Sequence, residues 1–178
     1  LYVCNDFDSP DRLWLNDGTG RFNAVPKTRI RQLSWFSMGV DFADINRDGL
    51  DDFFVLDMLS RDHQLRMNQS GILKRRIPVI GITDNRPQYV KNSFYLNRGH
   101  GFYSETAFYS GLQASEWAWA TAFMDVDLDG YQDLLITNGN ERDGRNIDIT
   151  SQLKRMRITR QMNRWEILVA RVAFPSLK

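Results

Sequence analysis

Asp-Ile-Asn-Arg-Asp-Gly-Leu-Asp-Asp, at residues 44–52, has a counterpart at residues 125–133, which read Asp-Val-Asp-Leu-Asp-Gly-Tyr-Gln-Asp. Both stretches place an oxygen-bearing side chain at positions 1, 3, 5 and 9, and a glycine at position 6. Alternate side chains of such a tight loop point inward, where their oxygens suit calcium, a cation that prefers several hard oxygen ligands. The glycine permits a sharp turn that a residue with a Cβ resists. The pattern therefore predicts two calcium-binding loops.

The predicted ligands occupy the same positions in both loops, and position 7 contributes its backbone carbonyl. They are Asp44, Asn46, Asp48, Leu50 and Asp52 in the first loop, and Asp125, Asp127, Asp129, Tyr131 and Asp133 in the second. A cluster of carboxylates is repulsive without a cation, so a bound ion also explains why the acids are tolerated. Magnesium fits less well, because it uses fewer protein ligands and stricter geometry. The alternative is that both stretches are ordinary Asp/Gly turns without a metal.

The residues after each loop separate this pattern from helical calcium motifs. An EF-hand ends with a glutamate at position 12 and is flanked by helices. Position 12 here is Val55 or Ile136, and the runs 53–56 and 134–137 are short, apolar and rich in β-formers. Such runs indicate strands buried on both faces. Dockerin-type repeats also continue as helices, so a strand–loop–strand unit remains.

The loops belong to a longer internal repeat. When residues 15–20 are aligned with 96–101, the two loops and their following strands also coincide without a gap. A partial third copy at 1–5 matches 53–57, but it reaches its next matched strand after far fewer residues than the middle copy does. The middle copy should therefore contain an insertion, and the segment 58–90 accounts for it.

These features predict an all-β fold, a partial β-propeller of about two blades with a loop insertion and a C-terminal helical segment. We expect 1–57 to be a blade region with the first calcium loop, 58–90 the insertion, and 91–148 a blade region with the second loop. Residues 149–178 form the expected helical insertion or tail. Two blades cannot close a ring, so we expect further blades in a longer parent chain.

Composition narrows the classes of function. With a net charge of +1, the chain offers no general attraction to polyanions, so we expect no nucleic-acid partner. The lone Cys4 excludes an intrachain disulfide, and no apolar run is long enough to indicate a membrane span. His63 and His100 are the only histidines, both in polar turns, and no nucleophile or phosphate-binding motif occurs. We therefore expect no catalytic residues and no enzymatic activity.

Two other features could bind a ligand. The insertion 58–90 contains several arginine and lysine residues, and long loops often carry binding function, but the favoured alternative is that it covers a blade edge or packs on a neighbour. The aromatic residues Trp35, Phe36, Trp117 and Trp119 could stack on sugars, but two of them occupy positions matched in the repeat, which favours core packing.

The loop pattern, F-x-D-x-[DN]-x-D-G-x-x-D before an apolar strand, resembles the FG-GAP/VCBS repeat of integrin-like propellers. More closely, residues 39–49 and 114–139 resemble the ASPIC/UnbV group, which is related to the cartilage acidic protein of animals. The Phe-Gly and Gly-Ala-Pro pairs that named the repeat are missing, as is an ASPIC/UnbV C-terminal segment. The resemblance implies calcium at the ten loop positions and an exported protein, located outside the cell, at its surface or in the periplasm.

The leading hypothesis is a non-catalytic set of calcium-binding propeller repeats that mediates adhesion to a protein or polysaccharide. Two Ca²⁺ ions would serve as structural cofactors. One alternative is the scaffold of a larger secreted hydrolase or lyase whose catalytic residues lie outside this chain. Another is a purely structural spacer without a ligand.

Overall fold

The computed structural model describes residues 1–6, 9–70, 86–139, 147–149 and 151–152. The chain divides into two compact units, one formed by Leu1–Leu59 with Arg75–Asn138 and the other by Ser60–Lys74 with Gly139–Lys178. The elements are β1 (Tyr2–Val3), β2 (Arg12–Asn16), β3 (Phe22–Ala24), β4 (Leu33–Ser34), β5 (Gly39–Ala43), β6 (Asp52–Leu56), β7 (Met58–Leu59), α1 (His63–Ser70), β8 (Gln88–Tyr89), β9 (Ser93–Asn97), β10 (Tyr103–Glu105), β11 (Glu116–Met124) and β12 (Asp133–Asn138).

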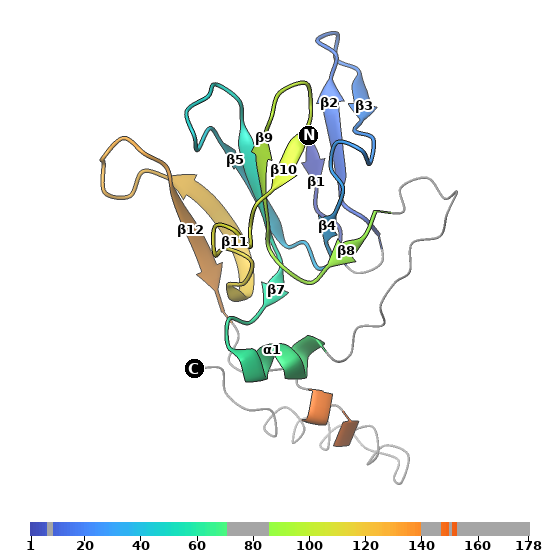
Figure 1. The fold of residues 1–178 in the computed structure, drawn as a ribbon, viewed down its shortest axis with the longest axis vertical. Coiled ribbons are helices and arrows are strands. Elements are labelled where there is room, and N and C mark those ends of the chain that lie inside the picture. Colours follow the sequence, from blue (N-terminus) through green and yellow to red (C-terminus); the bar gives the residue numbers. More distant parts are fainter. Residues whose placement is uncertain (7–8, 71–85, 140–146, 150, 153–178) are drawn as a thin grey trace. The chain divides into compact units, whose positions relative to one another are not determined.

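The strands of the first unit form a series of small sheets (Figure 1). Their orders are β1-β2-β3, β10-β9-β6-β5 and β12-β11-β7, and every pairing within these three sheets is antiparallel. A short parallel pair joins β4 and β8. The described residues are thus mostly β-sheet and form no closed barrel, which confirms the predicted all-β class.

The strand registers repeat in the same way as the sequence. The β1–β2 register recurs in β6–β9, and the β2–β3 register recurs in β9–β10, with each residue replaced by its counterpart in the repeat. For example, Asn16 pairs with Phe22, and the matched Asn97 pairs with Tyr103. The β5–β6 register likewise recurs over the matched part of β11–β12. The repeat is therefore structural, residue by residue, and not only a similarity of two acidic turns.

The segment 58–90 stands in the chain between two strand pairs of the sheet β10-β9-β6-β5, which we call the middle sheet. That sheet takes β5 and β6 from before the segment, and β9 and β10 from after it. At its start β7 pairs with β11, and at its end β8 pairs with β4. Helix α1 belongs to the second unit and begins after Asp62, whose carboxylate accepts the amide N–H of Leu65 at 2.9 Å. Asp62 therefore caps this helix.

The position of β6 between two core clusters explains why its residues 53–56 are all apolar. Side chains alternate across a strand. Phe53 and Val55 enter a core cluster shared with β1 and β2, whereas Phe54 and Leu56 enter a second cluster with β9 and β11. All five residues of β6 are buried. The aromatic rings of Phe53 and Tyr95 stack with centroids 4.5 Å apart inside the first cluster. At β6 the middle sheet is thus buried on both faces.

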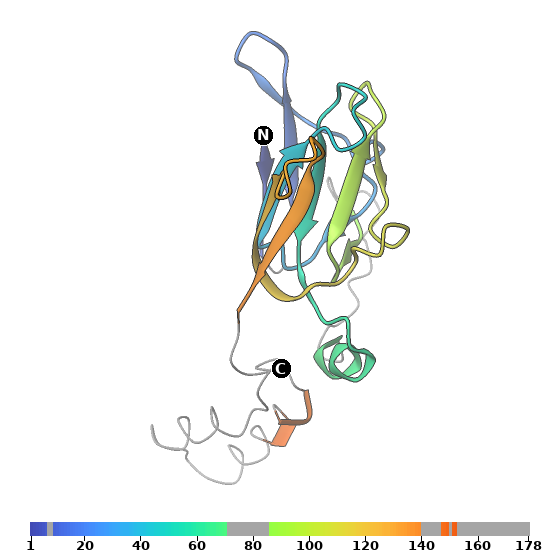
Figure 2. The same ribbon diagram turned by 90° about the vertical axis from the view of Figure 1, so that its left-hand side faces the viewer.

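The matched strand β12 departs from the expectation that both apolar runs are buried on both faces. Leu134 and Ile136 pack against the second cluster, but Leu135 is 46% exposed and Thr137 is also exposed. The cause is packing: one face of β12 lies against the second cluster, and among the described residues no further sheet covers its other face (Figure 2). The double burial predicted for 134–137 is therefore wrong within the described part of the chain.

The aromatic residues predicted to pack in the core do so unequally. Phe36 is buried, Trp35 and Trp117 are half-buried, and Trp119 is 44% exposed. The core prediction is thus wrong for Trp119, which lies at the register shift of β11 between Ala118 and Ala120, where two successive residues are exposed.

The histidines, Cys4 and the C-terminal segment were also singled out from the sequence. His63 and His100 are both exposed. Cys4 is half-buried, and burial raises the pKa of its thiol to about 12, which leaves it protonated near neutral pH. The predicted C-terminal helix lies almost entirely outside the described residues.

Candidate metal-binding loops

The two acidic loops occupy equivalent places in neighbouring hairpins. Residues 44–51 connect β5 to β6, residues 125–132 connect β11 to β12, and position 9 is the first residue of the following strand in both cases. Figure 1 shows both at the same end of the sheets, together with the β9–β10 turn. The conformation of each loop follows from its own side chains, which accept hydrogen bonds from its own backbone.

The carboxylate at position 1 organises each turn. Asp44 accepts the amide N–H groups of Asp48 at 3.0 Å and Gly49 at 2.8 Å. Asp125 accepts the corresponding amides of Asp129 at 3.0 Å and Gly130 at 2.8 Å. The carboxylate at position 1 thus stabilises the turn of the backbone at positions 5 and 6 in both loops.

The hydrogen bonds accepted at positions 3, 5 and 9 also agree between the two loops. The position 3 oxygen accepts the amide of position 5, at 3.1 Å in the first loop and 3.2 Å in the second. The position 5 carboxylate accepts the amide of position 7, at 3.0 and 2.8 Å. Asp52 and Asp133, at position 9, close the loops by accepting the amides of Ile45 and Val126. The side chains at positions 1, 3, 5 and 9 therefore all fold onto the backbone of their own loop.

Backbone dihedrals reveal one requirement that the sequence reasoning missed. Gly49 and Gly130 have φ of 82° and 87°, as expected for the glycine at position 6. Position 4 also lies in the left-handed region, with φ of 59° at Arg47 and 62° at Leu128. Residues other than glycine adopt this region at some energetic cost. The same strained residue in both loops shows that their shape is specific rather than that of a generic turn.

The size of the second loop suits a cation such as calcium. Asp125, Asp127 and Asp133 each place a carboxylate oxygen within 4.8 Å of the other two. Oxygens that share one calcium ion at about 2.4 Å can be no more than about 4.8 Å apart. The matched positions in the first loop are Asp44, Asn46 and Asp52, where an amide oxygen replaces one carboxylate. The oxygen donors at these positions are of the type that calcium accepts in both loops, and the first loop carries one charge fewer. Among the described residues, three acidic side chains come this close only in the second loop, and Asp129 lies outside that group.

The surroundings of position 9 differ between the loops. Asp52 is fully buried, and its other oxygen accepts the amide N–H of Asn97 from the end of β9 at 2.8 Å. The Asn97 side chain in turn donates to the carbonyl of Asp51 at 3.1 Å. Burial raises the pKa of Asp52, an effect that the hydrogen bonds from Asn97 and Ile45 oppose. Asp133 is exposed.

Arg47 joins the two loops directly. Its guanidinium lies 3.7 Å from the centroid of the Tyr131 ring and donates a hydrogen bond to the carbonyl of Gly130. Arginine over an aromatic ring is a favourable cation–π arrangement. The strained position 4 of the first loop thus contacts positions 6 and 7 of the second.

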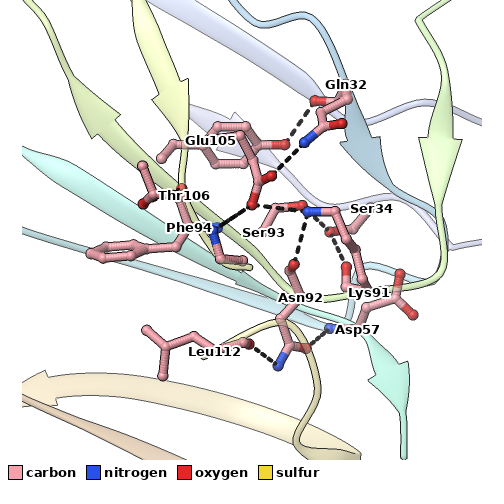
Figure 3. A network of polar contacts seen from close by, with 12 residues as sticks. Gln32, Ser34, Asp57, Lys91, Asn92, Ser93, Phe94, Glu105, Thr106 and Leu112 are labelled. Carbon is pink, nitrogen blue, oxygen red and sulfur yellow. Dashed lines mark hydrogen bonds and ion pairs between the residues drawn. The ribbon is translucent and has the colours of Figure 1, made fainter. Parts of the chain in front are cut away.

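A buried polar network lies behind the β9–β10 hairpin (Figure 3). Lys91 is almost completely buried and forms an ion pair with Glu105 at 2.9 Å. The same Glu105 carboxylate accepts a hydrogen bond from Gln32 and the amide N–H groups of Phe94 and Ala107. The sequence offers no signal for this pair, because its two members meet only through the pairing of the hairpin that lies between them.

A second buried position recurs in the repeat. The amide of Asn5 donates to the carboxylate of Asp11 at 2.7 Å, and the amide of Asp57 donates to Asn92 at 2.8 Å. These are matched donors and matched acceptors. Asp11 also accepts the hydroxyls of Tyr2 and Ser37, and burial raises its pKa against these hydrogen bonds.

No helix in the described part has the length and apolar character that a membrane span requires.

Comparison with known proteins gives a family match over the first part of the chain. Neither the curated proteins nor the solved structures gave a significant match. Residues 1–55, which include the whole of the first acidic loop, match the model of the FG-GAP-like repeat family, and this match supports the assignment of the repeat to that family.

Proposed function

We propose that each acidic loop binds one calcium ion and that the two ions stabilise the repeats of an exported β-propeller-type protein. The observation that carries this proposal is the gathering of Asp125, Asp127 and Asp133 within 4.8 Å, in a loop whose hydrogen bonds are duplicated at 44–52. The FG-GAP-like match over 1–55 and the residue-for-residue repeat support the propeller. In this proposal the protein has no catalytic role and belongs to the ASPIC/UnbV group within the FG-GAP/VCBS repeats.

The metal has a structural role in this proposal. Calcium dissociation constants of extracellular modules are roughly 10⁻⁴ to 10⁻³ M. At about 1 mM calcium, each site would then contribute on the order of 0.4 to 1.4 kcal/mol to the free energy of unfolding. That amount is useful in a marginally stable fold but far from decisive. The ligand that the repeats would bind is a protein or polysaccharide outside the cell.

Thermal melts of two single variants test the calcium part. Asp48→Ala and Asp129→Ala each remove a position 5 carboxylate that lies on the exposed side of its loop. Each variant should melt at a lower temperature than the original chain in about 1 mM calcium. In EDTA each variant should lose much less, because only exposed hydrogen bonds, such as the one from the amide of position 7, are removed. Equal losses with and without calcium would show that the carboxylates only shape the turns.

A further inference from the structure

A polar cavity of about 520 Å³ opens beside the β9–β10 hairpin. One wall is the segment 28–32, between β3 and β4, and the other is formed by the hairpin and its turn. Two hydrogen bonds fix the walls: the amide of Tyr103 donates to the carbonyl of Arg29 at 3.0 Å, and the hydroxyl of Tyr95 donates to the carbonyl of Gln32 at 2.8 Å. The volume lies in the range typical of small-ligand sites.

The charge that lines this cavity is positive. Arg29, Arg31 and Arg98 contribute three guanidinium groups. The acidic side chain in the lining is Glu105, whose carboxylate is already paired with Lys91 at 2.9 Å (Figure 3). Because that ion pair neutralises the carboxylate, the three arginines remain the effective charge, and an anion would be attracted to them. The chain as a whole is nearly neutral, so such recognition would depend on these side chains and not on a general field.

The β9–β10 turn packs against Arg29. A Cβ on Gly101 would come within 2.7 Å of the Arg29 guanidinium and 3.0 Å of Leu15. The φ of 74° accounts for glycine here, since the matched Gly20 has φ of 90° with no such neighbour. The Arg29 guanidinium lies 5.3 Å from the centroid of the Phe102 ring, and that ring is half exposed at the cavity. Arg98 donates to the hydroxyl of Ser104 at 3.2 Å.

The internal repeat shows that the hairpin does not require Arg98. The β2–β3 hairpin has the same register as β9–β10 but carries Asp17 at the position of Arg98 and Arg21 at the position of Phe102. On the other wall, the positions matched to Arg29 and Arg31 are Ser110 and Leu112. The hairpin is thus built elsewhere in the molecule without Arg98, which leaves that side chain available for binding. The segment at 110–112 differs in backbone from 29–31, because Gly111 has φ of 71° and the matched Ile30 does not have a positive φ.

We propose that this cavity binds an acidic saccharide unit, one that bears a carboxylate or a sulfate group. A guanidinium fork matches either oxyanion with two parallel hydrogen bonds. The exposed face of Phe102 offers an apolar surface for a sugar ring, and the hydroxyls of Thr28 and Ser104 can pair with sugar hydroxyls. This inference deepens the proposed function by naming the class of ligand, and it uses none of the ten loop ligands.

Titration calorimetry with four probes of similar length tests the inference. The probes are a tetragalacturonate, a sulfated heparin-derived tetrasaccharide, the neutral cellotetraose and a tetraglutamate peptide. We expect one or both acidic sugars to bind at least about tenfold more tightly than cellotetraose and the peptide. The carboxylated and sulfated probes distinguish the two sources of the anion. Equal affinity for the peptide would indicate a protein ligand instead and would overturn the saccharide assignment, as would no binding of either sugar.

Two variants locate the binding. Arg31→Gln combined with Arg98→Gln should weaken binding of the acidic sugar by at least about tenfold, because two charge-assisted contacts are lost. Both residues are exposed, so an unchanged melting temperature should show that the fold is intact. Arg21→Gln, which removes the same charge from the matched β2–β3 turn, should leave the affinity unchanged. Equal affinities of the double variant and the original chain would overturn the assignment of this cavity.

A salt series on the original chain supports the test without any mutation. Affinity for the acidic sugar should fall several-fold between about 0.05 and 0.5 M salt, because screening weakens exposed charge pairs. Affinity that does not change with salt would contradict the role of the arginines.

Two separate measurements distinguish this inference from the proposed calcium function. Calcium stabilisation is measured by melts without sugar, and sugar binding is measured by its own heat. Sugar binding in a chain that calcium does not stabilise would overturn the calcium proposal and leave the saccharide site standing. Calcium stabilisation without sugar binding would overturn the saccharide site and leave the calcium proposal standing.

Discussion

The two copies of the repeat, 11–57 and 92–138, share strand registers and loop hydrogen bonds but differ in their surroundings. In the first copy, Asp52 is buried beneath β9 and its turn, whereas the matched Asp133 is exposed at the edge strand β12. The loops nevertheless adopt the same shape, down to the left-handed residue at position 4. Loop conformation is therefore encoded locally, by side chains that accept backbone amides, while the cost of changing a loop depends on the sheet around it.

The largest expected effect concerns an ion pair that only one copy contains. The positions matched to Lys91 and Glu105 are Pro10 and Ala24, so the first copy folds without this pair. Lys91→Met leaves a largely buried carboxylate without its cation and should lower the free energy of unfolding by about 3 kcal/mol, measured by urea denaturation.

The control is the double variant Lys91→Met with Glu105→Gln. Glutamine keeps an oxygen that can accept the Phe94 and Ala107 amides but carries no charge. This variant should recover most of the loss. If the single and double variants were equally destabilised, packing of the lysine stem and not its charge would be the cause.

The next effect sharpens the comparison of position 9. Asp52→Ala in EDTA should cost about 2 kcal/mol, because it leaves the amides of Asn97 and Ile45 without their acceptor in a buried place. Asp133→Ala in EDTA should cost less than about 0.5 kcal/mol, because water can replace its carboxylate at an exposed site. Urea denaturation of both variants measures the difference, and equal costs would refute the role assigned to burial.

A charge exchange at position 3 tests whether the loops differ through their ligands. Asn46→Asp gives the first loop as many carboxylates at positions 1, 3, 5 and 9 as the second and should tighten its calcium affinity by about threefold to tenfold. Asp127→Asn should weaken the second site by a similar factor. In EDTA, Asn46→Asp should be slightly less stable, because it also removes the 2.9 Å hydrogen bond from Asn46 to Asp48. Calorimetry of the two exchanges provides the affinities, and unchanged values would exclude position 3 as a ligand.

The smallest effect concerns the buried Asp11, whose matched residue is Asn92. Burial raises the pKa of Asp11 in the folded protein above its value in the unfolded chain, so its ionisation costs stability as pH rises from about 4 through the raised pKa. Asp11→Asn keeps an acceptor for the Asn5 amide and removes that ionisation. The variant should therefore gain stability relative to the original chain as pH increases from about 4 to about 7, as measured by urea midpoints. A pH-independent difference would show that Asp11 does not titrate in this range.

Much of the fold could be read from the sequence because each copy repeats its turn residues and apolar strands at fixed spacing. The turns that follow Asn16 and Asn97 and the buried run at β6 follow from local pattern. The exposure of Leu135 could not be read in the same way, because burial depends on which sheet lies beyond β12.

The hydrogen bonds within each acidic loop were equally accessible from the sequence, because they join residues only two to seven positions apart. The Lys91–Glu105 pair was not, because its two members meet only when the β9–β10 hairpin pairs, and the arginine-lined cavity was not, because it depends on how separate segments pack together. Arg29 and Arg98, for example, come from different copies of the repeat and meet only when the segment 28–32 packs beside the β9–β10 hairpin.

The most direct test of the central claim, that both loops bind calcium, is calorimetric titration of the chain and of variants with one altered loop. The original chain should bind two calcium ions, and Asp44→Ala and Asp125→Ala should each bind one, with the remaining site close to its original affinity. Binding of a single ion by the original chain, or no calcium heat in a folded sample, would contradict the equivalence of the two loops.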